Sequence, residues 1–134
     1  MSWRIPKRPE YVEKLEITID TENPWSPPGE IEDDEKLTDI VFYLRAFTGH
    51  DTAHFSDMTI VAGRKGKTEV RSGAVGREKV IRGVAKIEGL EDPEGRPIER
   101  MTESVYRDLP SWITQRILRR LNEINEEEEK EEGN

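Results

Sequence analysis

The sequence predicts an α+β fold, with a small antiparallel sheet from the N-terminal half packed with short helices and the longest helix near the C-terminus. Three observations lead to this class. Apolar and polar residues alternate over 15–19, which is typical of a strand with one buried face. The run at 40–47 is short, apolar and rich in β-branched and aromatic residues, which favours a buried strand. Apolar residues recur at helical spacing from Ile113 to Ile124.

The domain organisation follows from length and charge. A chain of 134 residues suits one domain, which we expect to cover residues 1–124. Residues 1–10 contain Pro6 and Pro9 and should form an extended arm at its start. Residues 125–134 are mostly glutamate and have no apolar face, so we expect them to leave the last helix as a disordered acidic tail.

Composition narrows the possible functions. Hydrophobic residues make up 33% of the chain and charged residues 37%, so the core must be modest and the surface heavily charged. The absence of cysteine excludes disulfides, cysteine-ligated zinc and thiol catalysis. The net charge is −8, yet residues 62–82 carry seven basic and two acidic side chains, whereas residues 122–134 carry seven glutamates and one lysine. Such asymmetry is typical of an interaction protein, and equally of a charged surface that only maintains solubility.

No segment of the sequence suggests a membrane association. The first residues contain no apolar run of the kind found in a secretory signal, and no stretch is long and apolar enough to cross a bilayer. We therefore expect a cytoplasmic protein without a membrane partner.

The two predicted strands flank a proline-rich segment. Residues 21–35 contain three prolines and a glycine, which favours a loop, and we expect the strands at 15–19 and 40–47 to pair across it. Trp25 lies in this loop and is a candidate to hold it against the body of the protein.

Residues typical of a helix N-terminus follow the second predicted strand. Thr48 is a candidate cap with Asp51 three residues later, so residues 48–58 should form a short helix. Phe55 and Met58 fall on one face of it.

The secondary structure of the middle of the chain is harder to predict. Residues 59–61 and 68–71 flank a glycine-rich stretch, which predicts a hairpin or a glycine-rich connection. Residues 78–87 fit either a helix or a strand, and periodicity does not decide between them. Residues 89–97 carry two strong turn signals, Asp-Pro and Glu-Gly.

The C-terminal third predicts two helices. The first should begin at Thr102 and end before Pro110, because a residue that precedes proline disfavours helical geometry. Pro110 and Ser111 then open a longer helix. Its buried face is expected to hold Ile113, Ile117, Leu121 and Ile124, with Trp112 in the core beside them.

Large aromatic residues and exposed arginines are the candidates for partner binding, since tryptophan and arginine are enriched where interfaces gain most affinity. Arg116 and Arg119 should face solvent or a partner. The candidates are Trp3, Trp25, Phe55, Met58, Trp112, Arg116 and Arg119.

The sequence offers little support for catalysis. His50, His54 and Asp57 share a helix face and could bind a cation, but the only two histidines of the chain can equally be polar surface residues. The Gly-Lys-Thr triplet at 66–68 lacks the earlier glycine of a phosphate-binding loop. The basic stretch at 64–82 has no interleaved aromatic residues, so nucleic acid is not the favoured partner. We expect no catalytic residue, cofactor or metal.

The stretch from Phe42 to Ile124 resembles the tail assembly chaperones of long-tailed bacteriophages. Three segments carry the resemblance: VFYLRAFTGHDTAHFSDM at 41–58, REKVIRGVAKIEGLEDPEGRPI at 77–98 and LPSWITQRILRRLNEIN at 109–125. They are similar to an early strand followed by a helix, an apolar stretch that meets an Asp-x-x-Gly-x-Pro-Ile turn, and the helix after that turn.

The resemblance implies a protein in the host cytoplasm that binds the helical tape-measure protein and recruits tail-tube subunits. The main alternative is a structural virion component, such as a head–tail connector or tail-completion protein, whose proline-rich arm and loop would wrap neighbouring subunits. A metal-dependent enzyme using His50, His54 and Asp57 is the third. Self-association is left open by the sequence.

Overall fold

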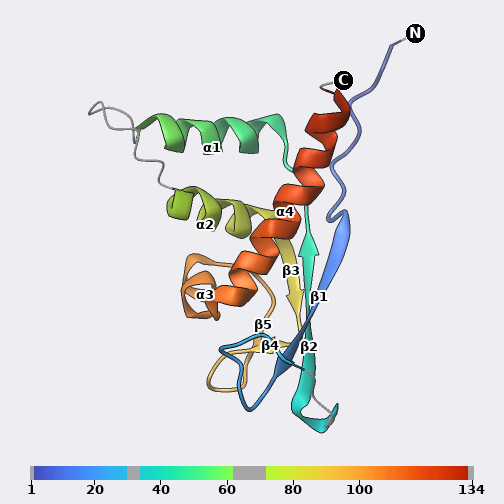
Figure 1. Cartoon of the computed structure of the whole chain (residues 1–134). Helices are drawn as coiled ribbons and strands as arrows, with labels where there is room; N and C mark the ends of the chain where they lie inside the picture. Colours follow the sequence, from blue (N-terminus) through green and yellow to red (C-terminus); the bar gives the residue numbers. More distant parts are fainter. Residues whose placement is uncertain (1, 30–33, 62–71, 133–134) are drawn as a thin grey trace.

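The computed structural model describes residues 2–29, 34–61 and 72–132 (Figure 1). It has the predicted α+β class, with a three-stranded antiparallel sheet and the longest helix near the C-terminus. The elements are β1 (Glu13–Asp20), the 3-10 helix η1 (Asp34–Lys36), β2 (Leu37–Leu44), α1 (Gly49–Val61), α2 (Ser72–Gly83), β3 (Val84–Glu88), β4 (Leu90–Glu91), β5 (Pro97–Ile98), α3 (Glu103–Asp108) and α4 (Ser111–Glu132).

The sheet has the strand order β1-β2-β3, and β4 and β5 form a separate small hairpin. The expected pairing of the first two strands is confirmed, with Ile17 opposite Ile40 and Leu15 opposite Phe42. Directly opposed residues share a face of an antiparallel sheet, so these side chains form one apolar surface. Phe42 extends that surface to Ile87 on β3.

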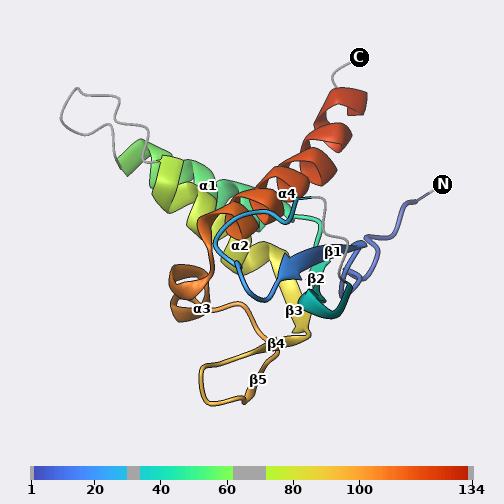
Figure 2. The same ribbon diagram turned by 60° about the horizontal axis from the view of Figure 1, so that its bottom comes forward.

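Helices α2 and α4 pack on this apolar face, and α1 lies beside α2 (Figures 1 and 2). The predicted stripe of α4 is confirmed, because Ile113, Ile117 and Leu121 are each 1% exposed or less. They join residues from all three strands of the sheet in one hydrophobic cluster. The core thus consists of one sheet face and the inward sides of two helices.

Two glycines let α2 and α4 approach closely. A Cβ atom at Gly83 would lie 2.6 Å from a terminal carbon of Leu121, and one at Gly76 would lie 2.9 Å from Leu118. Glycine in a helix costs about 1 kcal/mol relative to alanine. At these positions the missing side chain makes room for leucines of α4.

The ambiguous segment 78–87 contains both predicted structures. Helix α2 ends at Gly83, and β3 begins at Val84. Val80, Val84 and Ile87 are all buried in the same core. The helical and the strand periodicities therefore each apply to one half of the segment.

The two predicted C-terminal helices are confirmed. Thr102 caps α3, and its side chain accepts a hydrogen bond of 3.2 Å from the Val105 backbone N–H. Leu109, before the proline, is extended with φ −70° and ψ 143°. Thr48 likewise caps α1, and its hydroxyl accepts a hydrogen bond from the Asp51 backbone N–H.

The structure differs from the expected secondary structure at the ends of two helices. Thr59–Val61 were expected to begin a hairpin, but they complete α1; the rest of that hairpin, at 62–71, lies outside the described residues. Helix α4 was expected to end near Ile124, yet it continues to Glu132. Asn125 explains part of this, because its Oδ1 accepts a hydrogen bond of 2.8 Å from the Phe47 backbone N–H. Glutamate and lysine also have high helix propensity, which favours continuation of a helix already formed.

The expected N-terminal arm is present in the described residues 2–10, which belong to no helix or strand and have exposed side chains. Its far end lies at the same end of the molecule as the C-terminal end of α4 (Figure 1). Arg8 attaches the arm by hydrogen bonds to the Ala46 carbonyl, at 2.8 Å, and to the Asp51 carboxylate, at 3.2 Å. No described helix is both long and apolar enough to cross a bilayer.

The close approach of α2 and α4 generates a stability prediction. Gly83→Ala should lower the free energy of unfolding by about 1–3 kcal/mol, because the added methyl group overpacks a buried leucine. Gly73→Ala in the same helix is the control, since a Cβ there meets nothing within 4 Å. That change should raise stability by about 0.4–1 kcal/mol. Urea unfolding of both variants tests this, and a Gly83→Ala protein as stable as Gly73→Ala would contradict it.

Candidate functional site

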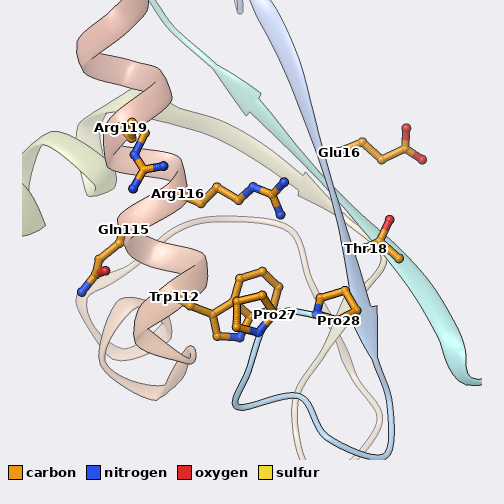
Figure 3. Close-up of a pocket in the computed structure, with 8 residues that line it drawn as sticks. All are labelled: Glu16, Thr18, Pro27, Pro28, Trp112, Gln115, Arg116 and Arg119. Carbon is orange, nitrogen blue, oxygen red and sulfur yellow. The ribbon is translucent and has the colours of Figure 1, made fainter. Parts of the chain in front are cut away.

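A groove runs between α4, β1 and the proline segment that follows β1 (Figure 3). Its volume is about 500 Å³. We call it the α4 groove. It is lined by Glu16, Thr18, Pro27, Pro28, Trp112, Gln115, Arg116 and Arg119.

Helical spacing brings three predicted binding residues to this groove. Trp112, Arg116 and Arg119 are four and three residues apart, so they lie along one side of α4. The neighbouring side carries the stripe buried in the core, which fixes the rotation of the helix. Figure 3 shows Arg116 extending from α4 towards β1.

Trp112 joins α4 to the proline segment. Its indole N–H donates a hydrogen bond of 2.8 Å to the Pro24 carbonyl, and its half-buried ring packs against the core cluster. Trp112 therefore has the core contacts expected of it and also the role that was predicted for Trp25. Trp25 does not hold the segment against the body of the protein, because its side chain is 71% exposed, and its role in partner binding stays a prediction.

Arg116 and Arg119 give the groove its positive charge. Both are exposed, as predicted, and neither forms an ion pair with another residue in the described parts of the chain. The adjacent Arg120 is fully engaged: its guanidinium binds Glu13 on β1, at 2.6 Å from Oε1, and Glu123, at 2.7 Å. The hydrogen bond from Arg120 holds the pKa of Glu13 below its usual value.

A second hollow continues the groove along α4. It has a volume of about 180 Å³ and shares Arg116 and Arg119 with the α4 groove. Leu15, Arg120 and Glu123 complete its walls. Arg116 and Arg119 thus lie between the two hollows. One hollow is bordered by Trp112 and the prolines, and the other by the salt bridge of Arg120.

The other predicted binding residues lie elsewhere. Phe55 is 6% exposed and packs edge-on against Phe47, with ring centroids 5.0 Å apart. It is a core residue and is not available to a partner. Met58 is half-buried on α1, and Trp3 is 78% exposed on the arm. Neither lines the α4 groove.

The histidine cluster does not assemble. His54 Nε2 lies 3.4 Å from a carboxylate oxygen of Glu78 on α2, whereas His50 and Asp57 are exposed. Among the described residues, no group of three or more potential ligands lies close enough to hold a metal ion.

The part of the basic stretch that the structure describes is used within the protein. Arg82 donates to Glu78 at 2.9 Å, Lys79 donates to Asn122 at 3.2 Å, and Arg77 lies 3.9 Å from Glu103. Residues 64–71 of this stretch lie outside the described ranges. In α2, therefore, each of these side chains has a partner within the protein, and the partners of Lys79 and Arg77 lie on α4 and at the start of α3.

Comparison of the chain with models of protein families, with curated proteins and with solved structures finds no match. The resemblance to tail assembly chaperones thus rests on the three sequence segments alone.

Several groove residues were not among the predicted candidates. Pro27 and Pro28 were expected in a loop, which only the virion-component alternative places against a neighbouring subunit, and Glu16 was expected on the polar side of a strand. The hydrogen bond between Trp112 and Pro24 brings these parts together across 88 positions of sequence. Local periodicity contains no signal for such a contact.

The hydrogen bond from Trp112 generates a prediction about the proline segment. Trp112→Phe removes the donor, so the free energy of unfolding should fall by about 1 kcal/mol, and the segment should become easier to cleave. Limited proteolysis and urea unfolding measure these effects. Trp25→Phe is the matched control and should change neither, because Trp25 is exposed. Equal effects of the two substitutions would show that Trp112 does not hold the segment.

Proposed function

We propose that this protein binds another polypeptide through the α4 groove and catalyses no reaction. The observation that carries the proposal is the pair of exposed arginines, Arg116 and Arg119, which lack an ion pair within the described structure and lie beside Trp112 and two prolines. Arginine and tryptophan contribute disproportionately to binding energy at protein interfaces.

The chemistry of the groove defines its partner. A guanidinium group binds carboxylates through two parallel hydrogen bonds, so Arg116 and Arg119 suit acidic side chains. Trp112, Pro27 and Pro28 supply a preformed apolar surface at the other end, and preorganised groups lose little entropy on binding. The favoured partner is therefore a segment that presents carboxylates next to an apolar side chain.

The resemblance described above suggests which polypeptide this is. A tail assembly chaperone would bind the tape-measure protein in the α4 groove and bring tail-tube subunits to it. The exposed apolar side chains Trp3 and Ile5 on the arm offer a second surface for the latter. Such a protein would work in the host cytoplasm, before particles are complete.

Co-expression tests this function directly. The chain is produced together with overlapping fragments of a tape-measure protein encoded in the same genome, and the soluble yield of each fragment is measured. At least one fragment should become more soluble and copurify. Arg116→Gln/Arg119→Gln should weaken its binding about tenfold or more, which corresponds to ~1.4 kcal/mol or more at a binding hot spot.

A matched control separates the groove from overall charge. Arg96→Gln/Arg107→Gln removes the same charge from two exposed arginines outside the α4 groove, which form only short-range ion pairs. This variant should bind like the wild type. The tape-measure assignment fails if no fragment responds, and the groove assignment fails if both double variants lose binding equally.

The arm favours a second candidate, a structural virion component. Trp3 and Ile5 are 78% and 80% exposed, and an extended arm with apolar side chains can pack on a neighbouring subunit. Mass spectrometry of purified particles and of infected cells distinguishes the two functions. We expect the protein in cells and not in particles; a fixed copy number in particles would instead identify a virion component.

A further inference from the structure

A second pocket, with a volume of about 640 Å³, lies where the arm meets the helical part of the protein. It shares no lining residue with the α4 groove. Four arginines reach it from four different parts of the chain: Arg8 from the arm, Arg45 just after β2, Arg82 from α2 and Arg100 before α3. We call it the arginine pocket.

The carboxylates of this pocket do not balance its arginines. Among the described residues, the ionisable side chains that line it are the four arginines, Glu10 and Asp51. Glu78, outside the lining, also binds Arg82 at 2.9 Å, which leaves an excess of one positive charge. Asp51 is already occupied, because its carboxylate accepts hydrogen bonds from Arg8 and Arg82, each at 3.2 Å, and from the Thr48 backbone N–H at 3.0 Å. Burial alone would raise the pKa of Asp51, but these partners outweigh it and hold the pKa below its usual value.

Arg45 lines the pocket without a carboxylate partner in the described parts of the chain. Its Nε atom is buried and has no hydrogen-bond partner among the described residues. The backbone of Arg45 is held in place by a hydrogen bond of 2.8 Å from its N–H to the Gly83 carbonyl. Neither Arg45 nor Arg100 forms an ion pair within the described parts of the chain. Arg45 and Arg100 are therefore the two guanidinium groups of the pocket that remain to pair with an added anion.

We propose that the arginine pocket binds a compact oxyanion of the phosphate class. Guanidinium groups match the oxygen geometry of phosphate and pair with it through two hydrogen bonds. No aromatic side chain is among the described residues that line the pocket, so this lining suits an anionic head group and offers no surface on which a base or ring would stack. The anion supplies the negatively charged partner that Arg45 and Arg100 lack among the described residues.

Binding of the anion would also attach the arm more firmly. Arg8 lies on the arm, whereas Arg45 and Arg100 belong to the body of the protein, and all three line the same pocket. An anion that contacts both sides therefore links them. A ligand that binds only the folded state raises its stability by an amount that grows with the logarithm of the ligand concentration once that exceeds Kd.

The test uses the full chain with inorganic phosphate and pyrophosphate, and sodium chloride at matched ionic strength as the reference. The melting temperature should rise with either anion, and more with pyrophosphate, beyond the change in chloride. In ¹H–¹⁵N spectra, the Arg45 Nε–H signal should shift in a saturable way. ADP in place of pyrophosphate shows whether a nucleotide or the free anion is the source of the phosphate, and binding of either supports the site.

Variants connect this response to the pocket. Arg45→Gln should reduce affinity for pyrophosphate about tenfold. Arg45→Lys, which keeps the charge but lacks the Nε–H, should also weaken binding, and it serves if the first variant does not fold. Arg96→Gln removes an exposed positive charge elsewhere and should bind as the wild type does.

Three results would overturn the proposal: no rise in melting temperature beyond that in chloride, unchanged affinity in both Arg45 variants, or an equal loss in Arg96→Gln. These outcomes are independent of the α4 groove, because substitution of Arg116 and Arg119 leaves every residue of the arginine pocket in place.

Discussion

The structure depends on the close approach of α2 and α4. Gly76 and Gly83 leave the space that Leu118 and Leu121 occupy, so α4 can lie against both α2 and the sheet. Once its isoleucine and leucine stripe is buried, the rotation of α4 is fixed. Trp112, Arg116 and Arg119 lie on the side of α4 next to this stripe, so they must then face the groove beside the proline segment. The α4 groove is thus a consequence of how the core is packed, and its arginines need no special backbone geometry to reach it.

The elements that could be predicted from the sequence are those whose signals are local. Alternation marked β1, an apolar run marked β2, and caps together with prolines marked α3 and the start of α4. The continuation of α4 past Ile124 was missed, because the helix propensity of its glutamates was set aside and because the hydrogen bond between Asn125 and the Phe47 backbone, 78 positions away, leaves no local signal. Likewise, the choice between Trp25 and Trp112 as the residue that holds the proline segment depends on which ring reaches Pro24 after folding. For the site, helical spacing linked Trp112, Arg116 and Arg119, but nothing local placed prolines beside them.

The α4 groove and the arginine pocket show why net charge alone is a poor guide to the local charge of a surface. The chain carries a formal charge of −8, yet the α4 groove and the arginine pocket each contain arginines that lack a carboxylate partner among the described residues. Elsewhere, arginines are paired, as Arg120 is with Glu13 and Glu123. At physiological ionic strength, charges separated by more than about 8 Å are largely screened. An anionic ligand therefore responds mainly to the guanidinium groups that it touches, and the general negative charge acts against unspecific association.

Both surfaces are bordered by carboxylates whose pKa values lie below the usual range. Arg120 lowers the pKa of Glu13 beside the α4 groove; around Asp51, burial acts in the opposite direction but is outweighed by Thr48, Arg82 and Arg8. A carboxylate with a lowered pKa in the folded state stabilises that state fully above its unfolded pKa, and this contribution is lost as pH falls through the folded value. The core beneath is formed by isoleucine, leucine, valine and phenylalanine, which do not titrate. Acid thus weakens the connections of β1 and of the arm to the helices while leaving the apolar packing intact, because the periphery of this modest core is held by charge and its centre is held by the close approach of two helices.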